Sequence, residues 1–171
     1  MRTLLLTSAL FAGLFGSLVA FAVHVPPSPV PPAPILSFCK TMWLFGSPCA
    51  EVSNTIVEQI LAFSPLNGCP QCQYTLLSAT PTTVIANHTS ADGLQSQNLT
   101  FSFSPLMIGG CSVTARSVTL GSTLVNGINY CNLYNLLSAS GLSSTPGFTD
   151  MTRAWACLGY GLTCSDAQVW Y

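Results

Sequence analysis

The chain contains very little charge. Only four of its 171 residues are Lys or Arg and five are Asp or Glu, a charged fraction of 5%, against about 25% in ordinary globular proteins. Nucleic-acid binding requires several phosphates to be neutralised by basic side chains, and these few scattered cations cannot form such a surface. Binding to anionic membranes is disfavoured for the same reason. Hydroxyls, amides and glycans must therefore keep the protein in solution.

The residues that carry acid–base chemistry are scarce as well. The chain has two histidines, His24 and His88, and a serine-hydrolase triad would have to combine His88 with Asp92, four residues later. Glu51 and Glu58 are seven residues apart, which is more typical of a solvated helix face than of an acid–base pair. We therefore predict a protein that is not an enzyme, with no catalytic residue and no cofactor. A small secreted hydrolase is an alternative.

The cysteines do not complete a redox or metal motif. Cys69 and Cys72 have the C-x-x-C spacing of thioredoxin-type proteins, but they follow turn residues and precede a strand-like run. The redox motif lies instead between a strand and a helix. A zinc site needs a second close pair or two histidines, whereas Cys157 and Cys164 are seven residues apart with no histidine nearby. The sequence predicts no metal site.

The N-terminus runs without a charge from Thr3 to Val23 and is largely apolar. Ala20 and Ala22 have the small-x-small spacing that signal peptidase recognises, which predicts a signal peptide over residues 1–22. A retained signal anchor is the alternative, but Ser and Gly interrupt the run and prolines follow it. We expect a secreted, extracellular protein with no membrane span after cleavage.

The mature chain is expected to have two parts. Six of the ten residues from Val25 to Pro34 are proline, so residues 23–35 should form an extended, polyproline-like segment. Residues 36–171 have the size of a single disulfide-rich domain.

All eight cysteines lie in this predicted domain, and in a secreted chain an even set indicates disulfide bonds. The predicted bridge-forming residues are Cys39, Cys49, Cys69, Cys72, Cys111, Cys131, Cys157 and Cys164. Eight cysteines allow 105 complete connectivities, and short loop closure favours two individual bonds, Cys39–Cys49 and Cys157–Cys164.

Hydrophobic periodicity predicts an α+β fold. Val52, Ile56 and Ile60 recur at every fourth position and predict a helix over 48–63. Short runs rich in β-branched and aromatic residues then predict strands over 73–80, 82–86, 98–104 and 112–120. We expect the N-terminal helix to pack on one face of a disulfide-stapled antiparallel sheet of about four strands.

The stretch from Gly127 to Leu137 interleaves cysteine, asparagine, tyrosine and leucine, and its period is ambiguous. A helix places Tyr130, Leu133 and Tyr134 on one face, and this pattern fits slightly better than the alternation of a strand. We interpret the stretch as a structural clasp built around Cys131 rather than as a site of chemistry.

Two sequons, Asn87-His88-Thr89 and Asn98-Leu99-Thr100, predict N-glycosylation at Asn87 and Asn98. We expect Asn87 and His88 to lie in a glycan-bearing loop. Asn98 should open a strand and point outward.

The block Asn-Tyr-Cys-Asn-Leu from Asn129, with Cys-Ser-Val-Thr-Ala-Arg-Ser from Cys111 and Pro-Gly-Phe-Thr from Pro146, resembles a family of uncharacterised secreted cysteine-rich animal proteins. This resemblance implies secretion and a shared disulfide scaffold, without a known activity. The predicted order of one helix followed by strands also resembles the cystatins, which are secreted inhibitors of cysteine proteases, but only at the level of the fold. The cystatin inhibitory motif Gln-x-Val-x-Gly does not occur in the chain.

Together these features predict a secreted glycoprotein that acts as a non-enzymatic binding or interaction module. Its partner would be an extracellular protein or a small apolar ligand. A cystatin-like protease inhibitor is the second possibility.

Overall fold

A computed structural model describes residues 37–67, 72–90, 93–119, 128–157, 160 and 164. All of them belong to one structural unit, Ala33–Tyr171. The predicted signal peptide, residues 1–22, and the proline-rich segment, residues 23–35, lie outside the described residues.

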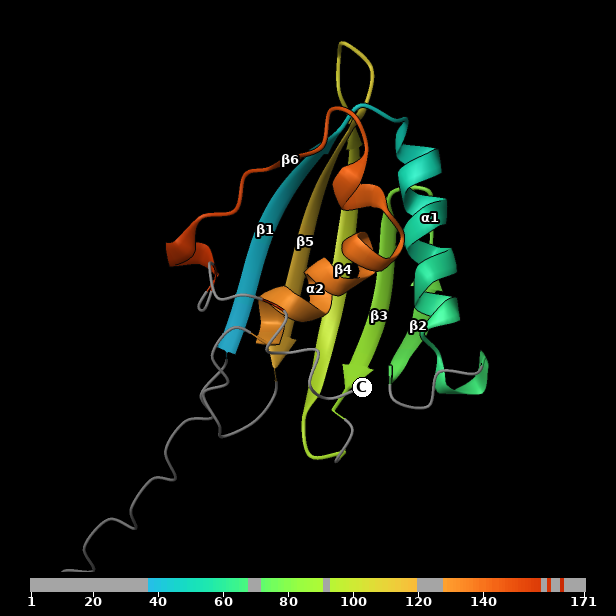
Figure 1. Ribbon diagram of the computed structural model, residues 1–171, viewed down its shortest axis with the longest axis vertical. Helices are drawn as coiled ribbons and strands as arrows, with labels where there is room; N and C mark the ends of the chain where they lie inside the picture. Colours follow the sequence, from blue (N-terminus) through green and yellow to red (C-terminus); the bar gives the residue numbers. More distant parts are fainter. Residues whose placement is uncertain are drawn as a thin grey trace, which may run out of the picture. The chain divides into compact units, whose positions relative to one another are not determined.

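The fold is built on a six-stranded sheet in the order β2-β3-β4-β5-β1-β6, with every neighbouring pair antiparallel (Figure 1). The strands are β1 Ser37–Phe45, β2 Tyr74–Ala79, β3 Thr83–Thr89, β4 Ser96–Pro105, β5 Cys111–Thr119 and β6 Thr149–Asp150. The sheet thus contains the four strands predicted from the sequence and two more.

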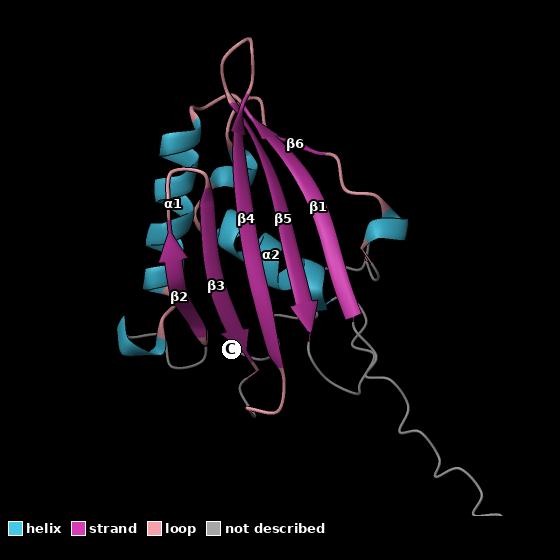
Figure 2. Ribbon diagram, turned by 180° about the vertical axis from the view of Figure 1, so that it is seen from behind, coloured by secondary structure: helices cyan, strands magenta, loops and turns pink. Residues whose placement is uncertain are grey.

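Two helices, α1 Cys49–Ala62 and α2 Ile128–Ala139, cover one face of the sheet (Figure 1). Seen from behind, the opposite face has no described helix on it, and we call it the open face (Figure 2). Three short 3-10 turns complete the described elements, η1 Pro65–Asn67, η2 Leu142–Ser144 and η3 Ala154–Ala156. No helix among the described residues is long and apolar enough to cross a bilayer.

The core lies between the sheet and the helices, and it is formed by the apolar faces of both. Leu99, Phe101 and Phe103 of β4 are buried while the residues between them are largely exposed, which confirms the predicted alternation. The predicted helix over 48–63 is confirmed as α1, whose Val52 and Ile56 are fully buried. The slightly favoured helix at 127–137 is confirmed as α2.

The predicted architecture, an N-terminal helix on a sheet of about four strands, is wrong. Strand β1 precedes α1 and lies between β5 and β6, and α2 follows β5. The alternation of β1 was obscured because both of its faces carry apolar residues. Trp43 and Phe45 are buried in the core, whereas Phe38 and Met42 point to the open face.

The disulfides join elements that are distant in sequence. Cys39 bonds to Cys157, Cys49 to Cys111 and Cys131 to Cys164, with Cα–Cα distances of 4.0, 4.8 and 5.3 Å. The predicted short-loop pairs Cys39–Cys49 and Cys157–Cys164 are therefore wrong. A disulfide needs Cα atoms within about 7 Å, and tertiary placement rather than chain separation brings them together. Cys72 is also disulfide-bonded, and Cys69 lies outside the described residues.

Candidate functional site

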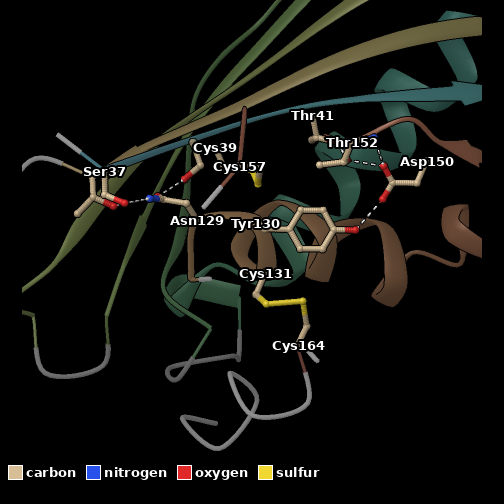
Figure 3. The surroundings of a disulfide bond; sticks show 12 residues. Ser37, Cys39, Thr41, Asn129, Tyr130, Cys131, Asp150, Thr152, Cys157 and Cys164 are labelled. Carbon is tan, nitrogen blue, oxygen red and sulfur yellow. Dashed lines mark hydrogen bonds between the residues drawn. A yellow bond between two sulfur atoms is a disulfide. The ribbon is translucent and has the colours of Figure 1, made fainter. Parts of the chain in front are cut away.

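Helix α2 is held on the sheet by a buried polar cluster around Asn129 (Figure 3). Asn129 Oδ1 accepts hydrogen bonds from Ser117 Oγ at 2.7 Å and Thr119 Oγ1 at 2.9 Å, both on β5. Its Nδ2 donates to Ser37 Oγ of β1 at 2.9 Å. One amide thus joins α2 to two strands and satisfies polar groups that would be costly to bury alone.

A second polar cluster surrounds His88 of β3, beneath the same helix. His88 Nδ1 lies 2.8 Å from Gln97 Oε1 on β4, which also accepts from Asn132 Nδ2 at 3.2 Å. Tyr74 donates to the Asn132 main-chain oxygen at 2.9 Å, and its ring lies 4.6 Å from the imidazole. His88 Nδ1 also lies 3.0 Å from Asn132 Nδ2, which can only donate, so Nδ1 has an acceptor and a donor beside it and each neutral tautomer can make one of the two hydrogen bonds.

The His88 cluster differs from a hydrolytic site in the group that orients the histidine. Two side-chain amides contact Nδ1 where a triad would place a carboxylate. The predicted alternative partner, Asp92, lies outside the described residues. Burial lowers the pKa of His88, and the Gln97 hydrogen bond opposes this effect. The cluster can therefore orient a neutral, half-buried imidazole.

Acidification should destabilise the protein through His88. Since its folded-state pKa lies below the ordinary value of 6.5, the unfolded chain binds more protons, and the free energy of unfolding falls as the pH drops below about 6.5. The slope from this residue is at most about 1.4 kcal/mol per pH unit. Thermal unfolding between pH 5 and 8 measures it. His88→Gln should flatten this dependence, and the assignment fails if His24→Gln flattens it instead.

A third polar cluster links α2 to the chain that follows β6 (Figure 3). Tyr130 donates to Asp150 Oδ2 at 2.7 Å, and the Thr152 backbone nitrogen donates to Asp150 Oδ1 at 2.8 Å. The Thr152 hydroxyl also bonds to Thr41 of β1. Burial raises the pKa of Tyr130, and the hydrogen bond to Asp150 raises it further, so the phenol remains a neutral donor.

These contacts support a structural role for α2. Cys131 in its first turns is bonded to Cys164, and Cys157 in the same C-terminal segment is bonded to Cys39 of β1 (Figure 3).

Glu51 and Glu58 are both exposed on α1. Among the residues described, no group of three or more His, Cys, Asp or Glu side chains is placed to hold a metal ion.

The two sequons lie side by side on the sheet. Asn87 of β3 and Asn98 of β4 are directly opposite each other in the register. Their neighbours His88 and Gln97 face α2, so both asparagines face the open side. Asn98 is exposed and Asn87 is half-buried. The predicted loop at Asn87 and His88 is wrong, because these residues lie inside β3.

The turn between β4 and β5, residues 106–110, presents two large apolar side chains to solvent. Met107 and Ile108 are both fully exposed. This hairpin tip projects past the neighbouring elements at the top of Figure 1. It is closed by hydrogen bonds from Leu106 N to Gly110 O at 3.2 Å and from Gly109 N to Leu106 O at 3.1 Å.

This apolar tip was not predicted from the sequence. The available signal was a Leu-Met-Ile run placed between two predicted strands, where turn residues are normally polar. No protein-family model matches the chain, and no curated protein matches it. The function must therefore be argued from the geometry.

Proposed function

We propose that this protein is a secreted, disulfide-stapled glycoprotein that acts without catalysis and binds an extracellular protein through its hairpin tip. The exposure of Met107 and Ile108 carries this proposal. Burying a side chain of this kind is worth about 1.5–3 kcal/mol. Adjacent, fully exposed apolar side chains are therefore candidates for an interaction site.

The tip is held in a fixed conformation by its base. Its closing hydrogen bonds join Leu106 to Gly109 and Gly110, and the next residue, Cys111, is bonded to Cys49 at the start of α1. Binding through such a tip needs little ordering of the chain, so more of the burial energy remains as affinity.

The shape and charge of the tip favour one kind of partner. A projecting turn fits into a concave apolar pocket of another protein, as interface anchors do. Residues 105–110 contain no basic side chain that could add attraction to an anionic membrane. We therefore favour a protein partner over a membrane or a small apolar ligand.

Secretion and glycosylation are supported by two features. Disulfides such as the three described here persist mainly in oxidising compartments. Asn98, in the sequon Asn98-Leu99-Thr100, is exposed on a face without a described helix.

A photo-crosslinking amino acid at Ile108 tests the binding site. In conditioned medium or on cells, it should give a discrete crosslinked product that excess unlabelled protein removes. The competitor Met107→Asp/Ile108→Asp should be at least about tenfold weaker, since two apolar anchors are lost. Leu66→Asp provides the matched control, because Leu66 is also almost fully exposed but lies on η1.

The proposal fails if Met107→Asp/Ile108→Asp competes as well as the unaltered protein, or if Leu66→Asp is weakened equally. The cystatin-like alternative is a special case in which the partner is a papain-like protease. A flat inhibition curve against papain would remove it.

A further inference from the structure

A single row of side chains crosses the open face at Asn98. The strand register places Asn98 opposite Asn87 on one side and opposite Val118 on the other, and Val118 lies opposite Phe38 of β1. Phe38 is 44% exposed, and Val118 is half-buried. Val118 and Phe38 therefore form an apolar strip on the side of Asn98 away from Asn87, bounded along β1 by Lys40.

We propose that Asn98 carries an N-linked glycan whose first sugars lie across Val118 and Phe38 and cover this apolar strip. The inference rests on the proposed passage through the secretory pathway, which supplies the glycan. It assigns the glycan a second role, as the cover of a sheet face on which the described chain places no helix. The faces of pyranose rings present C–H groups that pack against apolar side chains.

The two neighbours of Asn98 in the register differ in polarity. Asn87 on β3 and Val118 on β5 both lie directly opposite Asn98, with Cβ atoms about 4.5–5.5 Å away. The β5 side offers an apolar side chain against which a sugar ring can pack. Val118 on β5 lies on the other side of Asn98, toward the exposed Phe38.

Two cationic side chains lie beside the apolar strip. Arg116 lies opposite both Thr100, the hydroxyl residue of the sequon, and Lys40 of β1. Arg116 and Lys40 are exposed, and like charges placed opposite each other repel. Hydroxyl and N-acetyl oxygens of a glycan accept hydrogen bonds, so sugars lying beside this pair would satisfy its donors.

The two cationic side chains also argue against a second copy of the chain as the cover of the apolar strip. A symmetric contact over the apolar strip places the same patch of both subunits together. It would bring two Lys40–Arg116 pairs toward each other, and the part of the chain described offers no acidic side chain on the open face to offset them. A neutral, oxygen-rich glycan avoids this repulsion.

Matched variants test the assignment in protein secreted by cultured cells. Glycopeptide mass spectrometry should find Asn98 occupied. Asn98→Gln and Thr100→Ala each remove the sequon, and both should raise the fluorescence of an apolar-surface dye severalfold. Asn87→Gln removes the neighbouring sequon but leaves the strip covered, so dye binding should stay at the wild-type level. Adding Phe38→Ser to Asn98→Gln should remove most of the increase.

Three results would overturn the inference: an unoccupied Asn98 in the secreted protein, equal dye binding by the Asn87→Gln and Asn98→Gln variants, or a wild-type dimer that Phe38→Ser dissociates. The last result would assign the strip to self-association. The crosslinking test at Ile108 is independent of the glycan, so a failed crosslink with an occupied Asn98 rejects only the proposed binding site. Absence of the protein from the medium would reject both proposals.

Discussion

Replacing Cys39 and Cys157 together with alanine should lower the free energy of unfolding by about 4 kcal/mol. These cysteines are 118 residues apart, so their bond closes a loop that includes most of the described sheet. An isolated loop of this length would contribute about 5 kcal/mol, and the other bridges shorten the effective loop. The bond also fastens β1 to the segment after η3. Denaturant unfolding with a constant m-value would measure the loss.

The Cys131–Cys164 pair provides the internal control. Its cysteines are only 33 residues apart, so the double alanine variant should lose about 1 kcal/mol less than the Cys39–Cys157 variant. If the order of the two effects were reversed, native packing around α2 rather than the entropy of the unfolded chain would dominate the stabilisation.

Local elements were predictable where one face of the chain is apolar and the other is polar. Leu99, Phe101 and Phe103 alternate with polar residues and gave β4, and the Val52, Ile56 and Ile60 series gave α1. The pattern failed in β1, which shows Phe38 to the open face and Trp43 to the core. In α2, buried residues occur around the whole helix, so no clean stripe could distinguish it from a strand.

Relations between distant segments could not be predicted from local pattern. The insertion of β1 between β5 and β6 depends on pairing across most of the chain. Cys39 is bonded to Cys157 because β1 lies beside the segment that follows β6. The sequons were visible as motifs, but their direct opposition depends on the β3–β4 register. The placement of the two sequons side by side is therefore a product of topology, although their residues were identifiable from the sequence.

Gly110→Ala should destabilise the protein by about 4 kcal/mol, far more than an ordinary surface substitution. Gly110 has φ of +90°, and an added Cβ would meet the Phe45 main-chain oxygen at 2.4 Å. That oxygen belongs to the end of β1, so it cannot move away as a flexible side chain would. Left-handed strain alone costs about 1–2 kcal/mol, and the overlap with backbone accounts for the rest. Chemical denaturation of the purified variant measures the total loss in the free energy of unfolding.

Gly109→Ala separates the two contributions, because Gly109 has φ of +86° and no atom within 4 Å of an added Cβ. This variant should lose only the strain, about 1–2 kcal/mol. Equal losses at the two positions would mean that β1 and the hairpin base can separate at little cost. Such a base could not hold Met107 and Ile108 in a fixed position, and the preorganised tip on which the proposed binding depends would be excluded. A large difference between the variants would instead show that contact with β1 fixes the base of the tip.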